Sequence, residues 1–314
     1  MLPTESTQEF RTADDLLDGR LAARLHKIDI RTRRVFAGKL QGERRSKKRG
    51  QSVEFADHRP YAIGDDLRRI DWNIYGRLDR LFMKLFMEEE DLSLHLVVDC
   101  SASMGCGEPG KLAFSQRAAM ALAYVGLVNL NRVAVTAVGT DDEGGMRSVR
   151  DLRGRRRVHD AARFLGDLSA PEGESGLSFG AACKRIALSR RGRGVMVVLS
   201  DFLMREGYED GLRMLVGRGY DVVCIQVLSP QEIDPAGTEA VGGDLRLKDV
   251  EDGLSAEVTV SAPLLERYQK TLRAYQERLR TYCARRDATF LSVPSSLEMS
   301  TLILDYLRAR GVLG

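Results

Sequence analysis

Long apolar runs and a strong net charge are both missing from this sequence. No apolar stretch reaches the roughly 20 residues that a helix needs to span a bilayer, so no membrane span is expected. The opening residues lack the basic and apolar segments of a signal peptide, which predicts a cytoplasmic protein. The 48 basic and 45 acidic residues leave a net charge of only +3, which argues against a dedicated nucleic-acid-binding protein.

Paired-cysteine motifs are missing as well. The 5 cysteines are an odd number for a set of disulfide bonds, and no two of them form a Cys-x-x-Cys pair. Zinc or redox chemistry is therefore not expected at Cys100 and Cys106, although they lie close together in the sequence. We expect the thiols to be reduced and mostly buried, as is usual in cytoplasmic proteins.

The clearest functional signal is a carboxylate followed by two hydroxyls at the end of an apolar run. Residues 95–98 read His-Leu-Val-Val, and Asp99 follows, with Ser101 and Ser103 two and four residues further on. In an open α/β sheet, ligands bind at the carboxyl ends of the strands. Carboxylate and hydroxyl oxygens suit Mg²⁺, Mn²⁺ or Ca²⁺ rather than zinc. The pattern therefore predicts a divalent-cation site at these three residues.

Strand and helix patterns alternate along most of the chain. Apolar strands are predicted at 93–98, 132–138, 194–200, 221–228 and 289–293, with a short edge strand near 144–150. Amphipathic or alanine-rich helices lie between most of these segments. The run 194–200 is typical of a buried parallel strand, and Asp201 stands at its carboxyl end. This order predicts an α/β fold with a doubly wound, mostly parallel sheet of the Rossmann type.

Two regions depart from this alternation and suggest the domain organisation. Residues 1–20 are expected to form a polar tail, and 21–92 an N-terminal region with a basic helix, a charged strap and a strand. The main domain is expected to span 93–314. Within it, 229–261 interrupts the alternation with two short strand patterns, which predict a β-hairpin inserted at the sheet edge.

The charged strap covers residues 52–80. Acidic residues and arginines alternate there around Trp72 without a helical or strand stripe. Such a segment keeps one shape only if its charges pair, best by forked arginine–carboxylate contacts. We favour an ordered structural strap fastened to the main domain over a catalytic segment, and a partner-binding surface is compatible with either interpretation.

The arrangement of the polar residues resembles a von Willebrand factor A-like domain. The metal-ion-dependent adhesion site of that fold uses Asp-x-Ser-x-Ser, a threonine from a second loop and an aspartate from a third. The resemblance implies that Asp99, Ser101, Ser103 and Asp201 hold a cation. Its remaining position would take a carboxylate from another protein.

The second loop departs from this pattern. It reads Gly176-Leu177-Ser178-Phe179, so that Leu177 stands where the threonine is expected. Ser178 and Ser175 are alternative sources of the hydroxyl, and a cation held by fewer protein ligands is the third alternative.

A more specific resemblance lies upstream of this site. The run Gly64-Asp-Asp-Leu-Arg-Arg-Ile-Asp71-Trp72, preceded by Arg59-Pro-Tyr61, is similar to the bacterial family known as domain of unknown function family 58. The similarity extends over nearly the whole chain from Leu21. Members of the family are typically encoded beside MoxR-type AAA+ ATPases, which implies such an ATPase as the partner in protein assembly or maturation.

These observations leave three functions to compare. The favoured one is a non-enzymatic adaptor that recognises another protein through the cation site. The second is a Mg²⁺-dependent phosphotransferase or phosphatase with Asp99 as nucleophile. Against it, Ser101 stands where a haloacid-dehalogenase-type site has a second acid, and no Walker motif or nucleophile elbow is present. The third is nucleic-acid binding through Arg44–Arg49 and Arg153–Arg157.

Overall fold

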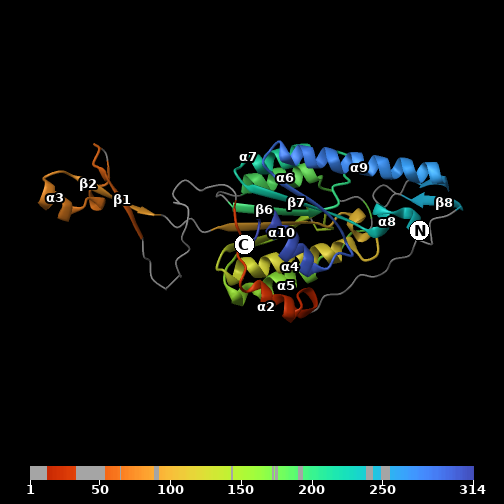
Figure 1. The fold of residues 1–314 in the computed structure, drawn as a ribbon, viewed down its shortest axis with the longest axis horizontal. Coiled ribbons are helices and arrows are strands. Elements are labelled where there is room, and N and C mark those ends of the chain that lie inside the picture. The colour runs from red at the N-terminus through yellow and green to blue at the C-terminus, as the bar shows by residue number, and fades with distance from the viewer. Residues whose placement is uncertain are drawn as a thin grey trace. The chain divides into compact units, whose positions relative to one another are not determined.

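The fold is described from a computed structural model of the chain, in which two compact units are distinguished. The described residues are 13–32, 54–63, 65–87, 92–142, 144–171, 173, 176–189, 194–237, 243–248 and 255–314. One unit comprises Met1–Arg33 together with Leu92–Gly314, and the other comprises Arg34–Asp91 (Figure 1). Each unit is described by itself below.

A six-stranded sheet forms the centre of the larger unit. Its strands are β3 (Ser93–Asp99), β4 (Arg132–Val138), β5 (Met146–Leu152), β6 (Gly194–Ser200), β7 (Asp221–Leu228) and β10 (Thr289–Pro294). They lie in the order β10-β7-β6-β3-β4-β5, and every pair is parallel except β4 with β5. The predicted α/β fold with a mostly parallel sheet is confirmed.

Helices cover both faces of this sheet (Figure 1). On one side lie α4 (Lys111–Val128) and α5 (Val158–Gly166). On the other side lie α6 (Phe179–Ser189), α7 (Glu209–Gly217) and the long α9 (Ala262–Ala284). The strands divide their side chains accordingly, since Leu96 and Val98 join the first core cluster and Val97 joins the second.

Two short helices at the start of the described chain pack onto the same core. They are α1 (Ala13–Leu16) and α2 (Gly19–Leu25), which contact α4 and α5. Leu17, Leu21 and Leu25 recur every four residues and are buried. The expected polar tail over 1–20 does not hold from Ala13 onward, because Leu16 and Leu17 are buried in the core beside α4 and α5.

The chain between β7 and β10 carries additional elements. They are α8 (Pro230–Ile233), β8 (Gly243–Lys248) and β9 (Ser255–Val260), which precede α9. After β10 follow a π-helical turn (Thr301–Tyr306) and α10 (Leu307–Ala309). β8 and β9 pair with each other antiparallel, as a two-stranded sheet of their own. Insertion of this hairpin at the edge of the main sheet stays a prediction.

The smaller unit contains regular elements where the sequence suggested an irregular strap. β1 (Glu54–Pro60) pairs antiparallel with β2 (Phe82–Met87), and α3 (Trp72–Leu78) lies between them in the sequence. The expected forked pair is present: both Nη atoms of Arg59 donate to the carboxylate of Asp65 at 2.7 Å. The attachment of this unit to the main domain stays a prediction.

Two sequence-based expectations concern the whole chain. All five cysteines are free, and four of them are buried, as predicted. Among the described residues, no helix combines the length and the apolar character that crossing a membrane requires.

Candidate functional site

Asp99 lies at the carboxyl end of β3, in the middle of the sheet. Its side chain is nearly fully buried, with the residue only 3 % exposed. Oδ1 accepts a hydrogen bond from the Ser101 amide at 2.9 Å, and Oδ2 accepts one from the Ser200 hydroxyl at 2.6 Å. Burial, followed by the charge of Asp201, raises the pKa of Asp99. No cationic side chain pairs with Asp99 in the part of the chain that the structure describes.

The two serines of the motif bring their hydroxyls together beside Asp99. Ser101 Oγ and Ser103 Oγ are 3.2 Å apart. The turn between them is held by the Met104 amide, which donates to the Ser101 carbonyl at 2.9 Å, and by the fully buried Met104 side chain. Two oxygens at this distance share one hydrogen, or one cation placed between them.

Asp201 follows β6, next to β3 in the sheet, and is 1 % exposed. Its Oδ1 accepts from the Leu203 amide at 3.1 Å, and its Oδ2 accepts from Lys111 Nζ at 2.9 Å. The Asp201 carbonyl accepts from Gln226 Nε2 at 2.9 Å. The carboxylate of Asp201, the predicted third-loop ligand, is therefore close enough to raise the pKa of Asp99. Among the described residues Asp201, unlike Asp99, pairs with a lysine, Lys111.

Lys111 is the residue that sequence analysis missed. It is 0 % exposed, and its Nζ also donates to Glu232 Oε1 at 2.5 Å. Burial alone would lower the pKa of Lys111, but the charges of Asp201 and Glu232 outweigh it and raise the pKa. Lys111 is the first residue of α4, where the partial positive charge of the helix dipole disfavours a lysine. This unfavourable position was the feature of the sequence that could have indicated a carboxylate partner for Lys111.

Glu232 belongs to a reciprocal cap at the start of α8. The Ser229 hydroxyl accepts from the Glu232 amide at 3.2 Å, and the Ser229 amide donates to Glu232 Oε2 at 2.7 Å. The other oxygen of Glu232 binds Lys111. One carboxylate thus joins α8 to the amino end of α4.

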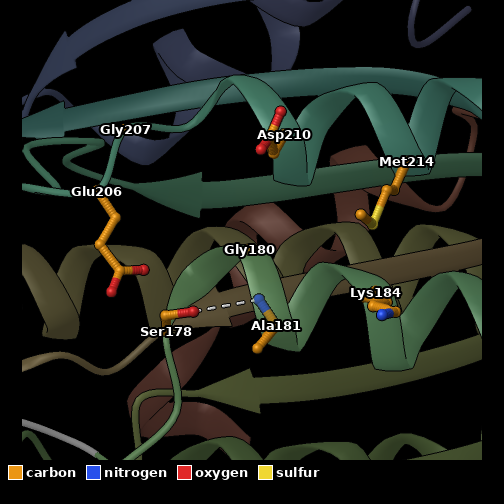
Figure 2. A pocket seen from close by; sticks show the side chains of 8 residues that line it. All are labelled: Ser178, Gly180, Ala181, Lys184, Glu206, Gly207, Asp210 and Met214. Atoms are coloured by element: carbon orange, nitrogen blue, oxygen red, sulfur yellow. Dashed lines mark hydrogen bonds between the residues drawn. The ribbon is translucent and has the colours of Figure 1, made fainter.

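Ser178 lies in a different environment from the other predicted residues. Its hydroxyl accepts from the Ala181 amide at 3.3 Å and so caps α6. Figure 2 shows Ser178 on the wall of a surface cavity of about 370 Å³ between α6 and α7, together with Lys184, Glu206 and Asp210. None of the hydrogen bonds described for Ser178 joins it to Asp99, and Ser175 lies outside the described residues.

The chemistry of these donors fits a divalent cation at Asp99, Ser101 and Ser103. A buried carboxylate without a cationic partner lies beside two converging hydroxyls, and all three are hard oxygen donors. Within the described ranges no group of three or more histidine, cysteine, aspartate or glutamate side chains is arranged so that it could hold a metal ion. Any cation here would thus depend on hydroxyl ligands as well as on carboxylates.

Residues 57–278 match the family model described as "Protein of unknown function DUF58". The chain belongs to the DUF58 family. This confirms the resemblance that the Gly64–Trp72 run indicated.

Relatives of this DUF58 chain occur in mycobacteria. It is 29 % identical over 268 residues to "Uncharacterized protein Rv1480" of Mycobacterium tuberculosis and to "Uncharacterized protein Mb1516" of Mycobacterium bovis, covering 83 % of this chain and 81 % of each relative. A segment is also 29 % identical over 122 residues to "Uncharacterized protein MAV169" of Mycobacterium avium, covering 38 % of this chain and 69 % of the relative.

Among solved structures, the pilus adhesin SpaC of Lactobacillus rhamnosus GG is similar to this chain with a TM-score of 0.43 and 9 % sequence identity. The match covers 71 % of this chain and 31 % of the adhesin, so the chain spans less than a third of that protein. A similarity this distant carries no argument about function.

Proposed function

We propose that this DUF58 protein is a non-enzymatic interaction module that binds another protein at the carboxyl ends of its central strands, through a divalent cation beside Asp99. One observation carries the proposal: Asp99 is a buried carboxylate whose hydrogen-bond partners are neutral donors. A buried charge without compensation is costly. Mg²⁺ or Mn²⁺ would compensate it and still accept a carboxylate from a partner.

The residues have distinct parts in this proposal. Asp99, Ser101 and Ser103 would hold the cation. Asp201 would support the site from the neighbouring strand, oriented by Lys111 at 2.9 Å. Ser178, whose hydroxyl caps α6, is a less suitable ligand.

Exposed apolar side chains near the site support a protein partner. Leu203 lies two residues after Asp201, and Ile233 follows Glu232; each is 39 % exposed. Apolar side chains around a polar centre are common in protein interfaces. The partner proposed from the family resemblance is a MoxR-type AAA+ ATPase, acting in protein assembly or maturation in the cytoplasm.

Two alternatives have less support. A nucleophilic aspartate of the haloacid-dehalogenase type works with a second acid two residues further on, where this chain has Ser101. For nucleic-acid binding, Arg44–Arg49 lie outside the described residues, and Arg157 pairs with Asp160 at 2.7 Å. Phosphatase activity that disappears in Asp99→Asn would favour the enzyme instead.

The decisive experiment measures cation binding and partner capture on the same proteins. Titration calorimetry with Mg²⁺ and Mn²⁺ is expected to give binding heat for the wild type and none for Asp99→Asn. The control Asp160→Asn removes an exposed carboxylate on α5 and should bind like the wild type. Capture of a purified MoxR-type ATPase from the same genome should be lost with EDTA and restored by Mg²⁺. Absence of binding heat at millimolar metal would contradict the cation mechanism, and EDTA-resistant capture would contradict its role in recognition.

A further inference from the structure

A buried hydroxyl without a hydrogen-bond partner among the described residues lies in the turn after β4, next to the loop that carries Ser101. Thr140 is 6 % exposed, and its Oγ1 has no hydrogen-bond partner in the part of the chain that the structure describes. The residue comes two positions after Val138, which is paired with Asp99 in the parallel register of β3 and β4. Thr140 therefore continues the chain beyond the level of Asp99, alongside the loop that carries Ser101.

The turn that carries Thr140 is in direct contact with that loop. The Cys100 amide donates to the Val138 carbonyl at 2.8 Å. At Gly139, a Cβ would lie only 2.9 Å from the Ser101 backbone nitrogen, and its φ of +76° favours glycine as well. Glycine at this position lets the turn approach the Ser101 backbone closely.

On its other side, the same turn contacts the 176–178 loop. Gly139 and Thr140 both donate from their amides to the Gly145 carbonyl, at 2.9 and 3.4 Å. A Cβ at Gly145 would lie 2.6 Å from Leu177 Cβ. The turn therefore lies between Ser101 and Leu177, an apolar side chain that has no oxygen to offer.

We infer that Thr140 Oγ1 is an additional oxygen ligand of the cation beside Asp99; the inference rests on the proposed function. A hydroxyl oxygen binds Mg²⁺ or Mn²⁺ as a neutral ligand, and this ligation would satisfy a buried polar atom. A divalent cation held by one carboxylate and three hydroxyls keeps a net positive charge. Such a site selects an anionic group, which is the chemistry of an acidic side chain on a protein partner.

The test compares matched variants by Mn²⁺ binding, followed by electron paramagnetic resonance and calorimetry. Thr140→Val keeps the shape and removes the hydroxyl, and it should weaken Mn²⁺ binding by about tenfold or more, as loss of a supporting group at a metal site typically does. Thr140→Ser keeps the hydroxyl and should bind close to the wild type. The control is Thr289→Val: Thr289 is also buried and its hydroxyl has no hydrogen-bond partner among the described residues, but it begins the edge strand β10.

Each outcome decides the inference. Wild-type affinity in Thr140→Val, with binding lost in Asp99→Asn, overturns the role of Thr140 and leaves the proposed function standing. Equal losses in Thr140→Val and Thr289→Val, or in Thr140→Val and Thr140→Ser, also overturn it, because the hydroxyl would then not be responsible. Absence of Mn²⁺ binding in the folded wild type overturns both the inference and the cation site. A selective loss in Thr140→Val supports it.

Discussion

At the scale of single residues, the buried charges at the carboxyl ends of β3 and β6 differ in how far they are neutralised by partners. Lys111 contacts two carboxylates, those of Asp201 and Glu232, while the hydrogen bonds that Asp99 accepts from described residues come from neutral donors. A buried ion pair need not stabilise a fold overall, but removal of one partner leaves the other charge exposed to the low dielectric interior. Lys111 is therefore a residue whose loss should be costly.

Replacing Lys111 by methionine should lower the free energy of unfolding by about 3–5 kcal/mol, because two carboxylates lose their common cation. Urea denaturation followed by circular dichroism measures this change. The control Lys184→Met removes an exposed lysine of α6 and should stay within about 0.5 kcal/mol of the wild type.

Neutralising the partners tests the cause of that loss. The triple variant Lys111→Met/Asp201→Asn/Glu232→Gln should recover part of the lost stability, since no unpaired charge then remains buried. A triple variant less stable than Lys111→Met alone would show that the lysine acts through packing of its side chain rather than through charge.

At the scale of elements, α3 illustrates how a cap allows a short helix to form. Asp71 Oδ1 accepts from the amides of Asn73 and Ile74, at 2.9 and 3.2 Å. Its Oδ2 lies 2.9 Å from His58 Nε2 and 3.6 Å from Lys84 Nζ, so that β1 and β2 both contact the cap. The contact with His58, and after it the helix amides and Lys84, lower the pKa of Asp71. The alternation of charges that suggested an irregular strap thus supports a regular helix.

The lowered pKa gives α3 a defined response to acid. Charged Asp71 contributes its stability above the ordinary carboxyl pKa of 3.8, and this contribution is lost as the pH falls through the lower pKa of the folded unit. Trp72 is the single tryptophan of the chain and the first residue of α3, directly after the capping Asp71. Its fluorescence therefore reports on the environment of this helix. This fluorescence should change with a midpoint below pH 3.8.

Two variants test that assignment. Asp71→Asn keeps a capping side chain but does not titrate, so the acid step in Trp72 fluorescence should disappear. Asp66→Asn, which changes the exposed cap of the preceding turn, should retain the step. A step that persists unchanged in Asp71→Asn would assign the transition to another group.

At the scale of the whole molecule, the larger unit is discontinuous in sequence. Residues 13–32 pack with 92–314, although a second unit lies between them in the chain. Ile30 pairs with Leu313 in an isolated antiparallel bridge, and the Asp29 and Gly314 backbones exchange two hydrogen bonds. The end of the unit's first segment is thus hydrogen-bonded to the end of its last segment.

Leu25→Ala tests how strongly the N-terminal helices belong to this unit. Leu25 is fully buried beside α4, so its truncation should cost about 2–5 kcal/mol of unfolding free energy, measured by urea denaturation. Leu188→Ala is the control, since Leu188 on α6 is 63 % exposed and should change stability by less than about 0.5 kcal/mol. Equal effects of the two substitutions would contradict a structural role for α2.

The parts of the fold that depend on local pattern were predictable from the sequence. Strands such as Gly194–Ser200 are continuous apolar runs, and their alternation with helices predicts the parallel sheet. An edge strand was also predicted over 144–150, and the structure has it at Met146–Leu152. The predicted polar tail was wrong from Ala13 onward, since Leu16 and Leu17 in a charged segment do not reveal which surface they cover.

By itself, the sequence determined the Asp99–Ser103 motif, its place after a strand and the family to which the chain belongs. Only the tertiary structure decided which groups surround that motif. Lys111 lies 90 residues from Asp201 and 121 from Glu232. The turn that carries Thr140 lies beside the Ser101 loop because β3 and β4 pair in parallel register. The physical reason is that burial and pairing of charges depend on contacts between distant segments, which no local spacing of residues encodes.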